Sequence, residues 1–169
     1  MLLHSRSGFQ APAQDVTVNR YFDDIETGEV WTSRFVELSE EEIIVFGRQY
    51  DPQFFHVDPV AAAKGPFGSI VASGWQLTSI AMREMILGKP DGDTPIVGIG
   101  ADEIRWLRPV RAGVRFAVRR EIVSKKASAS RPDRGTVKSA FALIDEAGTP
   151  LMTFTTLTII PCRPAGGGA

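Results

Sequence analysis

The chain has 169 residues, of which 43% are hydrophobic and 23% charged, and its formal net charge at pH 7 is −1. This composition is typical of one soluble globular domain, which at this size can bury a core without a disulfide or a structural metal. Apolar runs fall well short of the roughly 20 residues of a transmembrane helix, so we expect no membrane partner. The single cysteine, Cys162, cannot form an internal disulfide, which agrees with a cytoplasmic location.

Basic residues are concentrated in one part of the chain. Residues 105–138 hold eleven lysines and arginines but only two acids, Glu121 and Asp133. Solvent-facing strand positions explain such a cluster, and so does an anionic ligand such as a phosphorylated cofactor or carrier. We expect no nucleic-acid partner, because the basic residues lie among alternating strand positions and no aromatic-interleaved motif accompanies them.

Composition at the two ends sets the predicted domain boundaries. Residues 1–18 lack the long apolar core of a secretory signal and are predicted to be a flexible lead-in. Residues 163–169 are rich in glycine and are predicted to be a disordered tail. Residues 19–162 then form a single domain without a visible internal repeat.

The first regular elements of this domain are a strand and a helix. A strand is predicted over residues 30–37. The helix begins after Ser39, whose hydroxyl can cap the backbone while Glu42 reaches back to complete a capping box. It should end near Tyr50, because Pro52 disfavours helical geometry in the residue before it.

Two further helix starts follow. Asp58 is placed to cap a short helix that has Pro59 at its first position. Ser73 begins a longer helix that runs to about Leu87, with Gln76 placed for another capping box. Because this helix is apolar around most of its circumference, we expect it to be covered on most sides.

The remainder of the chain has the alternation of strands. Four strands are predicted, around residues 96–107, 114–119, 137–143 and 151–160. A polar connection is expected over 125–135 and a hairpin tip over 145–148. Paired in chain order as a meander, the strands would form an α+β fold, an antiparallel sheet wrapped around the long helix. One helix covers such a sheet poorly, so we expect a homodimer or higher homo-oligomer.

The polar residues most typical of a reactive site gather between residues 50 and 85. Asp51 is followed five residues later by His56, one of two histidines in the chain, and then by Asp58-Pro59 and a glycine-rich approach to Gly74. This pattern resembles the MaoC-like dehydratase family, which includes the (R)-specific enoyl-CoA hydratases. The similarity extends over most of the chain. The family's usual Asn-Pro is Gln53-Phe54 here, and its usual histidine before Gly74 is Ser73.

The resemblance implies a hot dog fold, usually dimeric, and a hydratase or dehydratase acting on an enoyl thioester such as enoyl-CoA. It assigns activation of water to Asp51 and His56, and binding of the thioester carbonyl to the Gly74 amide with Ser73 beside it. A carboxylate and an imidazole are together suited to polarise one water. Basic residues of 105–138 would meet the CoA phosphates. No metal and no redox cofactor is implied.

Alternatives remain for each of these residues. Asp51 is also explained as a turn residue, His56 as a structural histidine and Gly74 as ordinary helix-start backbone. A hot dog thioesterase and a non-catalytic acyl-thioester binding subunit are the competing functions. Metal-ligand spacing, a P-loop and a nucleophilic-serine elbow are all missing from the sequence.

Overall fold

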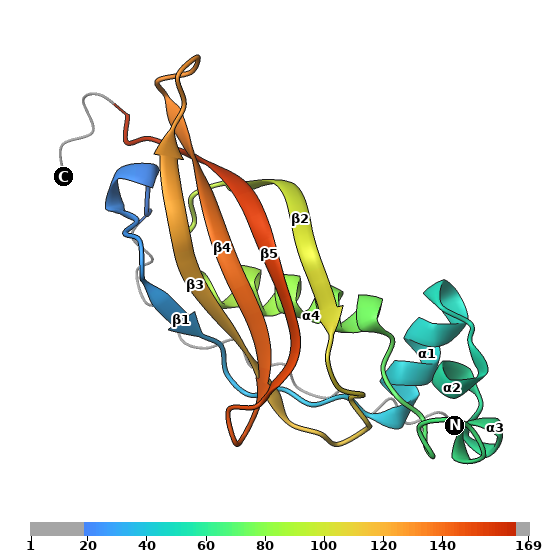
Figure 1. Ribbon diagram of the computed structural model, residues 1–169. Coiled ribbons are helices and arrows are strands. Elements are labelled where there is room, and N and C mark those ends of the chain that lie inside the picture. The colour runs from blue at the N-terminus through green and yellow to red at the C-terminus, as the bar shows by residue number, and fades with distance from the viewer. Residues whose placement is uncertain (1–18, 165–169) are drawn as a thin grey trace, which may run out of the picture.

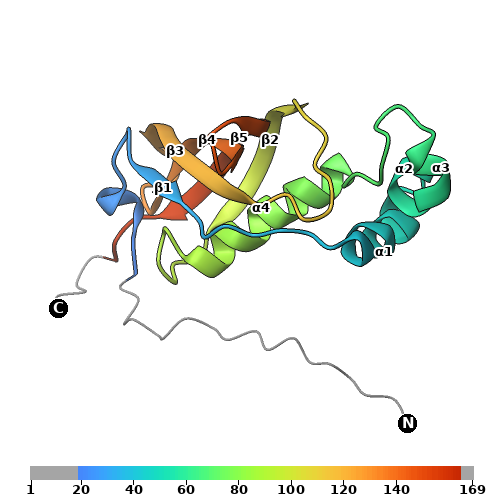
Figure 2. The ribbon, with the colours of Figure 1, turned by 90° about the horizontal axis from the view of Figure 1, so that it is seen from below.

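A computed structural model describes residues 19–164. Within them, a curved sheet lies across the long helix α4, and three shorter helices form a group beyond the N-terminal end of α4 (Figures 1 and 2). The elements in chain order are η1 (Phe22–Asp24), β1 (Val30–Thr32), α1 (Glu40–Tyr50), α2 (Phe54–Val57), α3 (Pro59–Ala63), α4 (Gly74–Gly88), β2 (Val97–Trp106), β3 (Phe116–Ala127), β4 (Arg134–Asp145) and β5 (Pro150–Pro161). The predicted lead-in over 1–18, and residues 165–169 of the predicted tail, lie outside the described residues.

Helices α1 and α3 begin as their sequences predict. Ser39 Oγ accepts a hydrogen bond from the Glu42 N–H, and Glu42 Oε2 accepts one from the Ser39 N–H, so the capping box is complete. Asp58 Oδ1 accepts hydrogen bonds from the N–H groups of Val60 and Ala61 at the start of α3. These caps satisfy helix N–H groups that would otherwise lack a partner.

Helix α4 also begins at its predicted position, but its cap differs from the prediction. Ser73 Oγ accepts a hydrogen bond from the Trp75 N–H at 3.3 Å. Gln76 does not complete a capping box; its side-chain amide instead donates to the Glu42 carbonyl in α1 at 3.0 Å. The expected local bond is thus replaced by a tertiary bond that joins α4 to α1.

Among residues 19–164, five strands form one antiparallel sheet in the order β1-β3-β4-β5-β2. The predicted meander is therefore wrong for β2, which pairs with β5 at an edge of the sheet (Figure 1). Short turns force β3, β4 and β5 to pair in sequence, whereas residues 107–115 are long enough to lead the chain from one side of the sheet to the other. The predicted hairpin tip at 145–148 is confirmed between β4 and β5.

Strand lengths also depart from the prediction. The strand predicted over 30–37 is reduced to β1 and an isolated bridge between Val36 and Phe116. The polar connection expected over 125–135 is confined to 128–133, because β3 and β4 extend into both of its ends. These extensions contain many polar residues, so the alternation of apolar residues did not predict them as strand.

The core lies between α4 and the sheet. It contains Leu77, Ile80, Ala81 and Met85 of α4, packed with Phe116, Val118, Phe141, Leu143, Met152 and Phe154 of the strands. The opposite face of α4 is uncovered, since Trp75, Met82 and Ile86 are 55%, 51% and 52% exposed. The prediction that this helix is covered on most sides is thus wrong for the single chain. Among the described residues, no helix is both long and apolar enough to cross a membrane.

Candidate active site

Asp51 is placed by the end of α1. It is the C-cap residue, its N–H donates to the Gly47 carbonyl at 2.9 Å, and Pro52 follows it. The chain then turns at once into α2, a four-residue helix between α1 and α3. Gly47 allows the two helices to lie in contact, because a Cβ there would be 2.8 Å from the His56 carbonyl oxygen. The side chains of Asp51 and His56 are thereby brought to one place.

His56 is buried, and its ring orientation is fixed by the backbone. Its Nδ1 lies 2.7 Å from the carbonyl oxygen of Val71. A carbonyl oxygen can only accept, so Nδ1 carries the hydrogen and donates. Val71 is itself held on both sides, by its N–H donating to the Phe55 carbonyl and by a bridge to Arg111. The neutral ring therefore presents its unprotonated nitrogen, Nε2, on the other side.

Nε2 of His56 faces Asp51, with Oδ2 3.2 Å away. A neutral imidazole with this tautomer and an ionised carboxylate both present lone pairs here, with no hydrogen between them. Either a proton on Nε2 or a molecule with two donor hydrogens, such as water, satisfies both groups. This arrangement is suited to bind a water and to take a proton from it.

The surroundings of Asp51 favour its ionised form. Partial burial acts to raise the pKa of the Asp51 carboxyl, but hydrogen bonds from Gln53 and Ser73, together with the positive charge that His56 carries when it is protonated, hold this pKa below its ordinary value. Gln53 Nε2 donates to Oδ1 at 2.9 Å, and Ser73 Oγ donates to Oδ2 at 2.7 Å. Ser73 is 1% exposed, so this bond is shielded from water.

Replacing Ser73 by alanine should change how Asp51 titrates. Loss of a hydrogen bond to the carboxylate disfavours the charged form, so the pKa of Asp51 should rise. If ionised Asp51 is required for turnover, the acid limb of the kcat/KM profile should move to higher pH by up to about one unit. Thr78→Ala is the control, because this hydroxyl donates to the Gly74 carbonyl within α4 rather than to Asp51. An acid limb that stays in place in Ser73→Ala would refute this role.

Gly74 is the first residue of α4, and its N–H makes no hydrogen bond to any residue that the structure describes. The positive end of the helix dipole adds to the pull of this donor on a carbonyl oxygen. A Cβ at Gly74 would lie 2.2 Å from the Trp106 ring, so the missing side chain makes room for Trp106.

Most of the basic residues in 105–138 have partners within the protein. Arg120 forms a buried two-bond ion pair with Asp91, and Arg115 and Arg119 pair with exposed glutamates. Among the described bases of this segment, Arg108, Lys126 and Lys138 form no side-chain hydrogen bond or ion pair. Contact of this segment with CoA phosphates stays a prediction.

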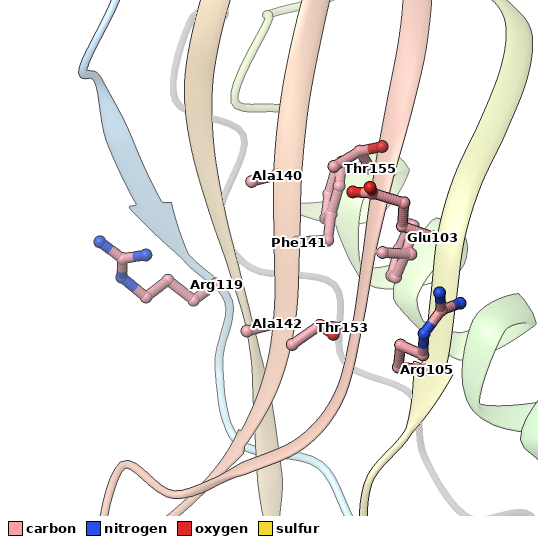
Figure 3. A pocket seen from close by; sticks show the side chains of 9 residues that line it. Glu103, Arg105, Arg119, Ala140, Phe141, Ala142, Thr153 and Thr155 are labelled. Atoms are coloured by element: carbon pink, nitrogen blue, oxygen red, sulfur yellow. The ribbon is translucent and has the colours of Figure 1, made fainter.

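A hollow of about 460 Å³ lies elsewhere, on the sheet face turned away from α4 (Figure 3). Ala140 and Ala142 line it and alternate along β4 with the core residue Phe141. Arg105 and Arg119 stand at opposite sides of it (Figure 3). Neither Asp51 nor His56 contributes to this hollow, so it is separate from the Asp–His pair. Within the described residues, no cluster of three His, Cys, Asp or Glu side chains is arranged to hold a metal ion.

A long antiparallel sheet around a central helix, with an acid and an imidazole at the helix N-terminus, is the arrangement of a hot dog dehydratase. The family model for the MaoC like domain matches residues 23–141. The chain therefore belongs to the MaoC-like dehydratase family, as the sequence pattern predicted.

Similar proteins agree with this assignment. The structure of a MaoC-like dehydratase from Rhodospirillum rubrum has a TM-score of 0.77 and 30% identity, covering 86% of this chain and 99% of that one. The R-hydratase PhaJ1 from Pseudomonas aeruginosa, at a TM-score of 0.71 and 20% identity over 86% of this chain and 88% of that one, shares the fold. The 3-hydroxyacyl-thioester dehydratase Z of Mycobacterium tuberculosis is 32% identical over 98 residues, 56% of this chain and 64% of that protein. In four curated relatives the matched region spans between 34% and 64% of their length.

The structure thus brings Asp51, His56 and Ser73 together, with Gly74 adjoining Ser73 at the start of α4. Sequence reasoning missed the Val71 carbonyl, because any residue can supply a carbonyl. It also missed the contact of Trp106 with Gly74, because the sequence showed only an aromatic residue at the end of a predicted strand.

Proposed function

We propose that this protein catalyses the reversible addition of water to an enoyl thioester, with enoyl-CoA giving 3-hydroxyacyl-CoA. One observation carries the proposal. Oδ2 of Asp51 and Nε2 of His56 lie 3.2 Å apart beside the N-terminus of α4, and the hydrogen bond of Nδ1 to the Val71 carbonyl fixes the orientation of the ring. At this separation the two groups can share a proton directly or present both acceptor atoms to a water that lies beside the pair.

The proposed chemistry follows from these two acceptors. A water bound beside the pair donates one hydrogen bond toward Asp51 and one toward His56. As its oxygen forms a bond to Cβ of the substrate, its proton passes to Nε2, and the resulting imidazolium returns a proton to Cα. The hydroxyl ends on Cβ and the hydrogen on Cα, so one water is added in all. General acid–base help of this kind is worth roughly 10²–10⁴ in rate.

Negative charge develops on the thioester oxygen while the Cβ–O bond forms. The Gly74 N–H is the proposed donor, because it is unpaired among the described residues and lies at the positive end of α4. Ser73 acts by positioning: its side chain bonds both Asp51 and the Trp75 N–H, so it holds the carboxylate at the helix terminus.

Product analysis on a panel of enoyl-CoAs tests the proposal. A hydratase forms 3-hydroxyacyl-CoA and reaches the same equilibrium from either side. Free CoA without a hydroxyacyl product would indicate a thioesterase instead. Tight binding of the whole panel with no product would indicate a non-catalytic acyl-thioester binding subunit. Either of these results would overturn the proposed function.

We further propose that the protein forms a homodimer through α4 and β2. Beside the exposed face of α4, the edge strand β2 carries Val97 and Ile99, which are 57% and 50% exposed. The half-exposed rings of Trp75 and Trp106 lie 5.4 Å apart, so α4 and β2 meet at exposed aromatic side chains. An unpaired edge and an apolar patch of this kind are typical of an interface between copies.

Replacing Ile99 by arginine should weaken this dimer, because a charge would have to be buried in it. Light scattering coupled to size exclusion should give the mass of a dimer for the wild type and a smaller mass for Ile99→Arg. Val45→Arg, on an exposed position of α1, is the control and should leave the mass unchanged. A monomeric wild type would contradict the proposal.

A further inference from the structure

Trp106 lies against the start of α4, beside the proposed carbonyl donor Gly74. A Cβ at Gly74 would meet three atoms of the indole, Cε2, Nε1 and Cδ2, at 2.2, 2.4 and 2.5 Å. Because these distances are so similar, the face of the indole, rather than its edge, covers the Cα of Gly74. The N–H bond of the indole lies in the plane of the ring, so Gly74 does not block it.

This indole N–H is a donor without an acceptor. A tryptophan N–H can donate but not accept. That of Trp106 makes no hydrogen bond to any residue that the structure describes. Trp106 is also 48% exposed, so its ring is open to a ligand that approaches this end of α4.

The N–H groups of Trp106 and Gly74 are close enough to bind one oxygen atom. Nε1 of Trp106 lies 2.4 Å from the position of a Cβ at Gly74, and two bonds of about 1.5 Å each join that position to the Gly74 nitrogen. The two nitrogens are therefore at most about 5.4 Å apart. An oxygen that accepts hydrogen bonds of about 2.9 Å from two donors spans up to roughly 5.8 Å between them.

We propose that Trp106 is a further catalytic residue, whose indole N–H donates to the thioester oxygen together with the Gly74 N–H. The inference rests on the proposed function and adds a second donor to it. The negative charge that forms on this oxygen as water adds to Cβ is then shared by donors from two elements, α4 and β2. Phenylalanine in place of Trp106 would pack on Gly74 without supplying a donor.

Replacing only the donor tests the inference. Benzothienylalanine keeps the shape of tryptophan but has sulfur in place of the indole N–H. Incorporated at position 106, it should lower kcat for enoyl-CoA hydration by roughly 10- to 100-fold, the effect of one hydrogen bond to a charged group. KM should change little, because the charge on the oxygen is largest in the transition state. Trp106→Phe should show the same split between kcat and KM.

Trp31 provides the matched control at the other end of α4. It packs on Gly88, the last residue of the helix, since a Cβ there would lie 2.3 Å from the Trp31 ring. Gly88 is about 21 Å from Gly74 along the helix axis. Benzothienylalanine in place of Trp31 should therefore leave kcat at the wild-type value.

Three results would overturn the inference. The first is an unchanged kcat with the analogue at position 106. The second is a rise in KM alone, which would assign the ring to substrate binding. The third is an equal loss of kcat with the analogue at position 31.

Failure of the proposed function is distinguished by the wild type, which would then hydrate no enoyl-CoA. In that case the infrared band of enoyl-CoA isotope-labelled at the thioester carbonyl decides the inference. A hydrogen bond to the carbonyl oxygen lowers the frequency of this band, so the wild type should lower it more than the protein with the analogue at position 106. Equal bands with both proteins would overturn the inference.

Discussion

Asp51→Asn and His56→Ala should each lower kcat/KM for enoyl-CoA hydration by roughly 10²–10⁴ while leaving the protein folded. Asparagine keeps the shape of the aspartate but cannot accept a water hydrogen with the strength of a charged oxygen. Alanine removes the nitrogen that takes the proton. Steady-state hydration, followed by the absorbance of the enoyl thioester, measures both losses.

A second acidic residue nearby provides the control for this experiment. Asp58→Asn makes the same chemical change seven residues along the chain, and asparagine caps a helix about as well as aspartate does. This variant should retain near wild-type turnover, because among the described residues the Asp58 side chain bonds only to N–H groups at the start of α3. Unchanged turnover in both Asp51→Asn and His56→Ala would remove the catalytic assignment, leaving a structural histidine and a turn aspartate.

The largest effect on stability is expected at Arg120. Its guanidinium and the Asp91 carboxylate form two hydrogen bonds, and the two side chains are 5% and 7% exposed. Arg120→Met would leave a buried carboxylate without its partner, which typically costs about 3–5 kcal/mol. Because a domain is stable by only about 5–15 kcal/mol, a fall in Tm on the order of 10 °C is expected by calorimetry.

The neighbouring Arg119 is a matched control for that prediction. It pairs with Glu121 at the surface, where both side chains are about two-fifths exposed, so Arg119→Met should change stability by less than about 0.5–1 kcal/mol. A second variant separates the lost pair from lost packing: adding Asp91→Leu to Arg120→Met removes the lone charge and should restore much of the stability. Equal effects of the two arginine substitutions would contradict the account.

Local signals in the sequence predicted the parts of the fold that depend on neighbouring residues. Ser39 with Glu42, and Asp58 with Pro59, set the helix starts because caps act within three residues. The place of β2 beside β5 could not be read in the same way. It depends on where residues 107–115 lead the chain, which no local pattern specifies.

In the candidate site, too, local sequence predicted some features, while others depend on tertiary structure. The spacing of Asp51 and His56 identified the pair, together with the resemblance to a known family. The tautomer of His56 depends on the carbonyl of Val71, fifteen residues away. Because every residue has a backbone carbonyl, the sequence does not show which one accepts this hydrogen bond. Gln76 was expected to complete a capping box in its own helix, yet its side-chain amide donates to the Glu42 carbonyl in α1, because tertiary packing overrides a local preference.

The claim that Asp51 and His56 act on one water is tested most directly by kcat/KM of the Asp51→Asn/His56→Ala double variant beside the two single variants. Residues that act as a unit show losses that do not multiply. The double variant should therefore be about as slow as the slower single variant. Losses that multiply in the double variant would show that the two side chains act independently and would contradict the shared water.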